Sequence, residues 1–247
     1  MNPIEPKSAL AWAEEIEQRT SSLSGTEVVL LPSFPHLSLV GATLKKTKLG
    51  AQDVFWEEKG PYTGEVSVVQ LKNMGISYIL VGHSERRTHF GETDEGVNKK
   101  IKAVLNHGMK AILCVGEKTR EEGEISAVVG ESLRRGLEGL KKQHIQNLII
   151  AYEPVWAIST NPDAKADTPD SAFRASLFIR KEVAVVYDRK TADDVRIVYG
   201  GSVRKENIES FLHEGKMGGA LVGGASLNPE EFSTIVSLAS HTSKKRP

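Results

Sequence analysis

Seven short apolar segments recur along the chain, and most are followed by a pattern typical of an amphipathic helix. They show little polar alternation, which is typical of strands covered on both faces of a parallel sheet. The segments are residues 27–31, 48–52, 78–81, 111–115, 148–152, 195–199 and 220–222. Strands that alternate with helices predict right-handed crossovers and a parallel α/β fold.

A further helix is predicted over residues 7–19, ahead of the first of these strands. A closed parallel barrel of alternating strands and helices needs eight strands. We therefore expect one domain over residues 1–247, a (β/α)8 barrel that lacks its first strand in this chain and has seven strands plus a leading helix. The polar, basic residues 240–247 are expected to form a flexible tail.

Composition narrows the function classes. The chain has 32 basic and 32 acidic residues, so no net charge attracts nucleic acid or an anionic membrane. No apolar run reaches the roughly 18 residues that span a bilayer, and the N-terminus lacks a signal-peptide pattern. Cys114 is the single cysteine, which excludes an intrachain disulfide and favours a reducing compartment. We expect a cytoplasmic protein with no nucleic-acid or membrane partner.

Glu153 follows the continuous apolar run 148–152 and is itself followed by Pro154. Proline has no amide hydrogen to give to a sheet, so Glu153 is predicted at the carboxyl end of strand 148–152. Parallel α/β folds carry their chemistry at that end. Taken alone, however, an acid before a proline more often simply closes a strand.

Other loops at the same end of the predicted sheet carry polar groups and glycines. His83, Ser84 and Glu85 follow strand 78–81, and two glycine pairs follow the last two strands: Gly200-Gly201 before Ser202, and Gly223-Gly224. Glycines let backbone amides approach an anion closely. Each pair alone is more often a tight turn, but together in this position they favour a phosphate site.

These segments together resemble the triosephosphate isomerase family. The matching residues are 52–65, 81–95, 112–117, 151–158, 199–203 and 221–227. The resemblance implies a TIM barrel without metal or cofactor that interconverts dihydroxyacetone phosphate and glyceraldehyde 3-phosphate. It implies Glu153 as the base and neutral His83 as the electrophile, with Ser84 and Glu85 in support. A helix that begins at Ser84 would disfavour the imidazolium form of His83.

The same resemblance implies a lid after Trp156 and a phosphate site that includes Ser159, Ser202, Gly223 and Gly224. The lid departs from the commoner family form, because Ser159 replaces a glycine and the segment is longer. Its far end is predicted to be fixed by Thr168 as a helix N-cap, with proline at the first helical position.

A second departure lies at the N-terminus. The family has a catalytic lysine at the end of its first strand, and this chain has no matching residue. Lys7 is no substitute, because it lies in or before the leading helix. Glu85 would lack its family partner and be protonated or repacked. We therefore expect strongly depressed isomerase activity, whether the cause is a late start codon or a lineage-specific loss.

The loop over residues 55–65 is long and rich in aromatic side chains. The resemblance implies that it inserts into a partner subunit through Thr63, Gly64 and Glu65, which predicts a homodimer that is weakened if the first strand is absent. The alternative is a loop that packs only on its own subunit.

Two other functions remain open. Another phosphate-binding barrel enzyme would explain the glycine pairs, but it would not explain the segments around His83 and Glu153. A catalytically silent relative that binds sugar phosphate would explain the missing lysine, but it would leave both of those residues unexplained.

Overall fold

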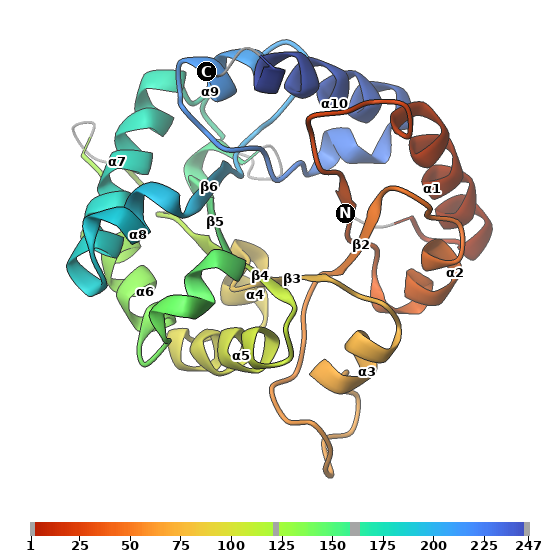
Figure 1. Cartoon of the computed structure of the whole chain (residues 1–247), viewed down its shortest axis with the longest axis horizontal. Helices are drawn as coiled ribbons and strands as arrows, with labels where there is room; N and C mark the ends of the chain where they lie inside the picture. Colours follow the sequence, from red (N-terminus) through yellow and green to blue (C-terminus); the bar gives the residue numbers. More distant parts are fainter. Residues whose placement is uncertain (1–2, 121–123, 159–163, 245–247) are drawn as a thin grey trace.

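The computed structural model describes residues 3–120, 124–158 and 164–244. Its strands form a single curved parallel sheet in chain order, surrounded by helices (Figure 1). The strands are β1 Val29–Leu30, β2 Lys48–Ala51, β3 Tyr78–Val81, β4 Lys110–Val115, β5 Leu148–Tyr152 and β6 Arg196–Tyr199. The structure thus confirms the predicted parallel α/β barrel architecture.

The helices follow the strands in the expected alternation. They are α1 Pro6–Thr20, α2 Leu37–Gly41, α3 Val68–Asn73, α4 Ser84–His89, α5 Asp94–Asn106, α6 Ala127–Leu137, α7 Pro169–Val186, α8 Arg189–Asp194, α9 Ile208–His213 and α10 Pro229–Lys244. Four short 3-10 helices complete the described part of the chain: η1 Phe34–His36, η2 Lys142–Asn147, η3 Val155–Ala157 and η4 Gly224–Leu227. Within it, no helix is long and apolar enough to cross a bilayer.

The strands are covered on both faces, as their apolar runs predict. One face of the sheet contributes Tyr78, Leu80, Ile112 and Val198 to a cluster inside the barrel. The opposite side chains, such as Ile79, join the larger core beneath the helices. This double burial fixes the strand register, because a slip of one residue would exchange the two faces.

Two predicted strands are shorter than expected. The segment 27–31 forms only β1, and 220–222 forms a single bridge, between Ala220 and Tyr199. Within the described residues, the sheet ends at β1 on one side and at Ala220 on the other. Each of these segments has a strand neighbour on only one side, so fewer backbone hydrogen bonds hold it in extended form.

The leading helix is confirmed as α1. It packs against both α10 and α2, so the first and last helices lie side by side in Figure 1. The predicted tail at 240–247 is partly wrong, because α10 continues to Lys244 and Ser240 is buried. The buried hydroxyl of Ser240 donates a hydrogen bond to the Val236 carbonyl, so this buried polar group has a partner.

Candidate active site

Glu153 lies directly after β5 and is 2% exposed. Its amide donates to the carbonyl of Val115 at 2.8 Å, while the carbonyl of the preceding Tyr152 accepts from Gly200 at 2.8 Å. The sheet ladder therefore continues to Glu153 on the β4 side, and Pro154 ends it there. The predicted position of Glu153 at the carboxyl end of its strand is confirmed.

The Glu153 carboxylate faces the start of α4. Its Oε1 lies 3.0 Å from His83 Nε2, and its Oε2 accepts the Ser84 amide at 3.1 Å. The structure thus brings together three of the predicted site residues from two strands that are not neighbours in the sheet. The fourth, Glu85, has a half-exposed side chain that lies 3.8 Å from His83 Nδ1.

His83 is also the N-cap of α4, because its Nδ1 accepts the Glu85 amide at 3.3 Å. A ring nitrogen that accepts carries no hydrogen, so this cap selects the neutral tautomer with its hydrogen on Nε2, toward Glu153. Burial lowers the pKa of His83, but the hydrogen bond to Glu153 and its charge outweigh burial and raise the pKa overall. The expected influence of the helix end on this ring is therefore opposed by Glu153.

Two glycines frame Glu153 and leave no room for a side chain. A Cβ at Gly116 would lie 1.7 Å from the Glu153 carbonyl oxygen, and one at Gly200 would lie 2.9 Å from Glu153 Cγ. Sequence reasoning missed Gly116 and assigned Gly200 only to phosphate binding. Both act by letting neighbouring strands approach the backbone of the base.

A second buried acid, Glu117, holds the turn after Glu153. Its Oε1 accepts hydrogen bonds from the Tyr152 hydroxyl at 2.7 Å, Trp156 Nε1 at 3.1 Å and Arg120 Nε at 3.0 Å. Burial, followed by the charge of Glu117, raises the pKa of Tyr152. These contacts give Glu117 a structural role beside the site.

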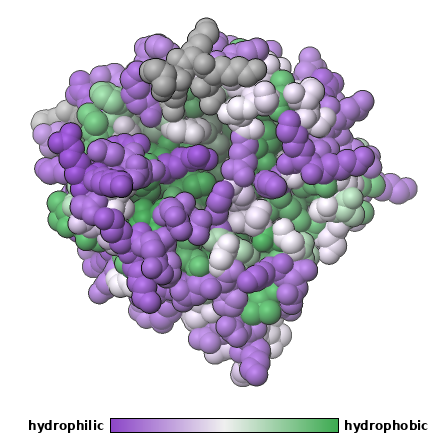
Figure 2. All heavy atoms as spheres, viewed as in Figure 1, coloured by the Kyte–Doolittle hydropathy of each residue, from purple (hydrophilic) through white to green (hydrophobic). Residues whose placement is uncertain are grey.

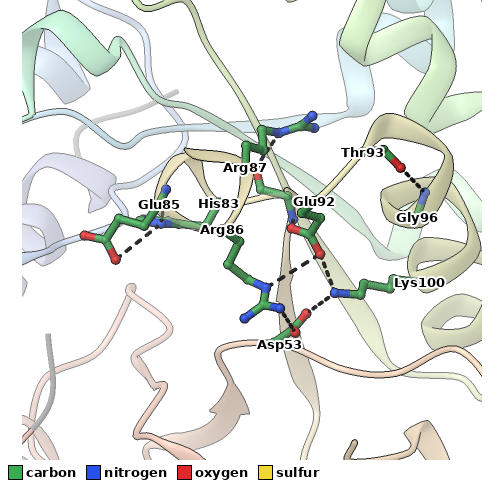
Figure 3. Close-up of polar contacts among 10 residues, drawn as sticks. Asp53, His83, Glu85, Arg86, Arg87, Glu92, Thr93, Gly96 and Lys100 are labelled. Atoms are coloured by element: carbon green, nitrogen blue, oxygen red, sulfur yellow. Dashed lines mark hydrogen bonds and ion pairs between the residues drawn. The ribbon is translucent and has the colours of Figure 1, made fainter. Parts of the chain in front are cut away.

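A group of four charges, of which only Arg86 is substantially exposed, supports the other side of the site (Figure 3). Asp53 pairs with Arg86 at 2.8 Å and with Lys100 at 2.6 Å, and Lys100 also contacts Glu92. Glu92 in turn accepts the amide of Gly82, the residue before His83, at 3.1 Å. Burial raises the pKa of Asp53, although the charge of Lys100 opposes that shift. The network therefore ties α5 to the backbone that carries His83.

Both arginines of α4 form ion pairs. Arg87 pairs with Asp94 at 2.6 Å and donates from Nε to the Gly82 carbonyl at 2.8 Å. Arg86 pairs with Asp53. Both arginines are thus occupied in holding loops.

A cavity of about 1290 Å³ joins these residues to the predicted phosphate residues. His83, Glu153, Ser202, Gly223 and Gly224 all line it. In Figure 2, hydrophobic residues line the central hollow of this face and hydrophilic ones surround it. The arrangement can hold a small polar molecule between the carboxylate and the glycine turns.

The phosphate residues differ in their present contacts. Ser202 donates from both its amide, at 3.3 Å, and its hydroxyl, at 2.7 Å, to the Ala157 carbonyl in η3. Gly223 faces open space, since a Cβ there would meet nothing within 4 Å. Ser159 lies outside the described residues. The predicted cap at the far end of the lid is confirmed, because Thr168 accepts the Ser171 amide at 3.2 Å.

The loop predicted to bind a partner subunit packs on itself at its base. Phe55 contacts Trp56 and Tyr62, with ring centroids 4.3 and 4.6 Å apart. Thr63, Gly64 and Glu65 are exposed at its tip. The aromatic side chains at the base of the loop thus contact one another. The three residues at its tip remain exposed to solvent.

Comparison with known proteins agrees with this geometry. The family model described as triosephosphate isomerase matches residues 1–239. A triosephosphate isomerase from Caldanaerobacter subterraneus is 47% identical over 235 residues, covering 94% of this chain and 93% of the relative. One from Dictyoglomus thermophilum is 44% identical over 230 residues, covering 92% and 91%. One from Geotalea uraniireducens is 46% identical over 232 residues, also covering 92% and 91%. The chain belongs to the triosephosphate isomerase family.

Proposed function

We propose that this chain interconverts dihydroxyacetone phosphate and glyceraldehyde 3-phosphate, with Glu153 as the base and His83 as the electrophile. The observation that carries the assignment of roles is the buried Glu153 carboxylate, 3.0 Å from His83 Nε2 in the lining of the cavity. The family match supports the reaction itself and favours it over that of another phosphate-binding barrel enzyme.

The reaction moves one proton between adjacent carbons. Glu153 takes a proton from the carbon beside the carbonyl, while the Nε2 hydrogen of His83 is donated to the carbonyl oxygen and stabilises the enediolate. Glu153 then returns its proton to the neighbouring carbon, while the hydroxyl proton of the other oxygen passes by way of His83 Nε2 to the first oxygen, so that the other oxygen becomes the carbonyl. The buried Glu153 and the partly buried His83 limit the access of water to this intermediate.

The phosphate is assigned to the glycine turns and the neighbouring serines. Gly223 and Gly224 line the cavity, and the open space beside Gly223 leaves room for an anion. The amide and hydroxyl of Ser202, which now donate to Ala157, would exchange that carbonyl for phosphate oxygens. The resemblance adds Ser159 to this set.

We also propose depressed turnover for this chain. No lysine lines the cavity within the described part of the chain. Glu85, which meets that lysine in the family, lies beside His83 instead. Loss of one preorganised electrostatic group typically lowers the rate by about 10² to 10³-fold. The same observation favours the second candidate, a relative that binds sugar phosphate without turnover.

We also propose a quaternary structure and a cellular location for this chain. The exposed tip of loop 55–65 supports a homodimer in which Thr63, Gly64 and Glu65 contact the partner. Balanced charge and a single, buried Cys114 support a reducing, cytoplasmic location. Sedimentation measures the first, and cell fractionation measures the second.

Turnover of glyceraldehyde 3-phosphate tests the central proposal. We expect weak but measurable activity from the unmodified chain and a further fall of about 10² to 10⁴-fold for Glu153→Gln, because the base is lost without a change in shape. Exposed Glu206 provides a control, since Glu206→Gln should change nothing.

Three outcomes would redirect the assignment. Equal activity in Glu153→Gln and the unmodified chain would show that Glu153 is not the base. Binding of inorganic phosphate with no detectable turnover would favour the silent relative. Activity in the usual range of the family's enzymes would contradict the proposed loss from the missing lysine.

A further inference from the structure

Trp12 in α1 connects the start of the chain to the turn that carries Gly224. Its indole Nε1 donates to the carbonyl of Ser226, in η4, at 2.7 Å, across 214 residues of sequence. Trp12 is partly buried and lines the same cavity as His83 and Glu153. It is not among the residues that the family resemblance assigns to the site.

The turn that contains Gly223 and Gly224 needs contacts that hold it against the barrel. Its internal hydrogen bonds run from the amide and hydroxyl of Ser226 to the Gly223 carbonyl, at 2.9 and 2.7 Å. These bonds shape the turn but do not place it against the barrel. The chain before it, around Ala220, is bridged to β6 on one side, and the described sheet ends there. Trp12 approaches from the side where the sheet ends.

The other support comes from α10. Asn228 follows the turn and accepts the amides of Glu230 and Glu231 through its side chain, which anchors the C-terminal end of η4 to that helix. Trp12 acts two residues earlier, at Ser226. Because α1 packs against α10, both anchors belong to one pair of helices.

We propose that Trp12 is a positioning residue for phosphate: by holding the Ser226 carbonyl, it fixes the orientation in which Gly223 and Gly224 present their amides to the cavity. This inference rests on the proposed function of the glycine turn. A preorganised set of amides binds an anion more tightly, because the ordering cost is met during folding. Phosphate is held alike in substrate and transition state, so the loss of Trp12 should weaken binding and leave the chemical step unchanged.

The variant Trp12→Phe keeps an aromatic side chain and removes the donor. We expect inorganic phosphate to bind about fivefold more weakly, which corresponds to the loss of one typical hydrogen bond. The KM for glyceraldehyde 3-phosphate should rise by a similar factor, with kcat within about twofold of the unmodified chain. Calorimetry measures the first and a coupled assay measures the other two.

Tyr187→Phe is the matched control. It also removes an aromatic donor to a backbone carbonyl, since the Tyr187 hydroxyl donates to Leu140 at 3.0 Å, but Tyr187 does not line the cavity. We expect this variant to bind phosphate as the unmodified chain does. If Trp12→Phe fails to fold, benzothienylalanine at position 12 keeps the bicyclic shape and removes only the N–H.

Five outcomes decide the inference. Weaker phosphate binding in the position-12 variant alone, with kcat unchanged, supports it. Unchanged phosphate binding in that variant, or equal losses in the variant and in Tyr187→Phe, overturns it and leaves the proposed function standing. A loss confined to kcat also overturns it. An unmodified chain that binds no phosphate overturns the inference and the assigned phosphate site together.

Discussion

At the scale of single residues, the site depends on the contact between the buried Glu153 carboxylate and the partly buried His83 ring. His83 Nε2 faces Glu153 and His83 Nδ1 accepts from α4, so the ring is held from both sides. The acceptor role of Nδ1 favours the neutral ring, whereas the carboxylate favours the charged one. The net direction is a raised pKa of His83.

This direction predicts a pH dependence of stability. Because the folded-state pKa of His83 is raised above 6.5, the folded chain binds this proton more tightly than the unfolded chain does. The resulting contribution to the free energy of unfolding is fully present below about pH 6.5 and is lost as pH rises through the folded-state pKa. Urea unfolding of the unmodified chain and of His83→Gln between about pH 5.5 and 9 measures it.

We expect the difference in stability between those two chains to shrink as pH rises. A parallel series with His213→Gln, at an exposed position, corrects for the other titrating groups. A difference that is constant across this range, or that grows with pH, would show that Glu153 does not favour the imidazolium in the folded protein.

The sequence predicts the reacting residues better than their supports. Glu153 and His83 can be predicted from the sequence, because each comes soon after an unbroken apolar run. The roles of Gly116 and Trp12 cannot be predicted in this way, because their contacts join segments that are distant in the sequence. Gly116 contacts Glu153, and Trp12 contacts a residue 214 positions away. No local pattern encodes such a crossing.

At the scale of elements, strands with two neighbours follow the sequence most closely. The apolar runs predict β3 and β5 at their observed bounds, because both faces of each are buried. The segments 27–31 and 220–222 have equally apolar sequences but form only two strand residues and one bridge. The length of each of these strands depends on pairing with neighbouring strands, and the sequence of one segment alone does not determine that pairing.

The N-terminus of α7 gives a prediction at this scale. The hydroxyl of Thr168 accepts the amide of Ser171, so Thr168→Ala removes the cap and should lower the free energy of unfolding by about 1 kcal/mol. Thr168→Ser keeps the hydroxyl and should lie within about 0.5 kcal/mol of the unmodified chain. Chemical denaturation compares the three, and equal stability of the two variants would contradict a capping role.

At the scale of the whole molecule, the proposed homodimer depends on the loop over residues 55–65. Its aromatic base is packed on itself, and Trp56 also lies beneath the Lys99 ammonium, 5.4 Å from the ring centroid. The base therefore fixes the loop on α5, while Thr63 and Gly64 remain exposed. A rigid base with an exposed tip suits insertion into a partner with little ordering cost.

Sedimentation tests the proposed dimer. The unmodified chain should sediment at about 54 kDa, twice its mass of 27.0 kDa, at concentrations where association is favourable. Thr63→Arg, which places a bulky charge at the tip, should shift the equilibrium toward monomer. Ser22→Arg, at an exposed site outside the loop, should leave it unchanged. A monomer at all concentrations would contradict the proposal.

The two glycines beside Glu153 also limit how the protein can change. At positions 116 and 200, any larger residue must displace the backbone or side chain of the base, so saturation mutagenesis should recover almost only glycine there. Gly223 faces open space, so a small side chain there would leave the fold intact but would occupy the room assigned to the anion. Selection for folding alone would therefore retain glycine at positions 116 and 200 and relax it at 223, whereas selection for turnover of a phosphorylated substrate would retain all three.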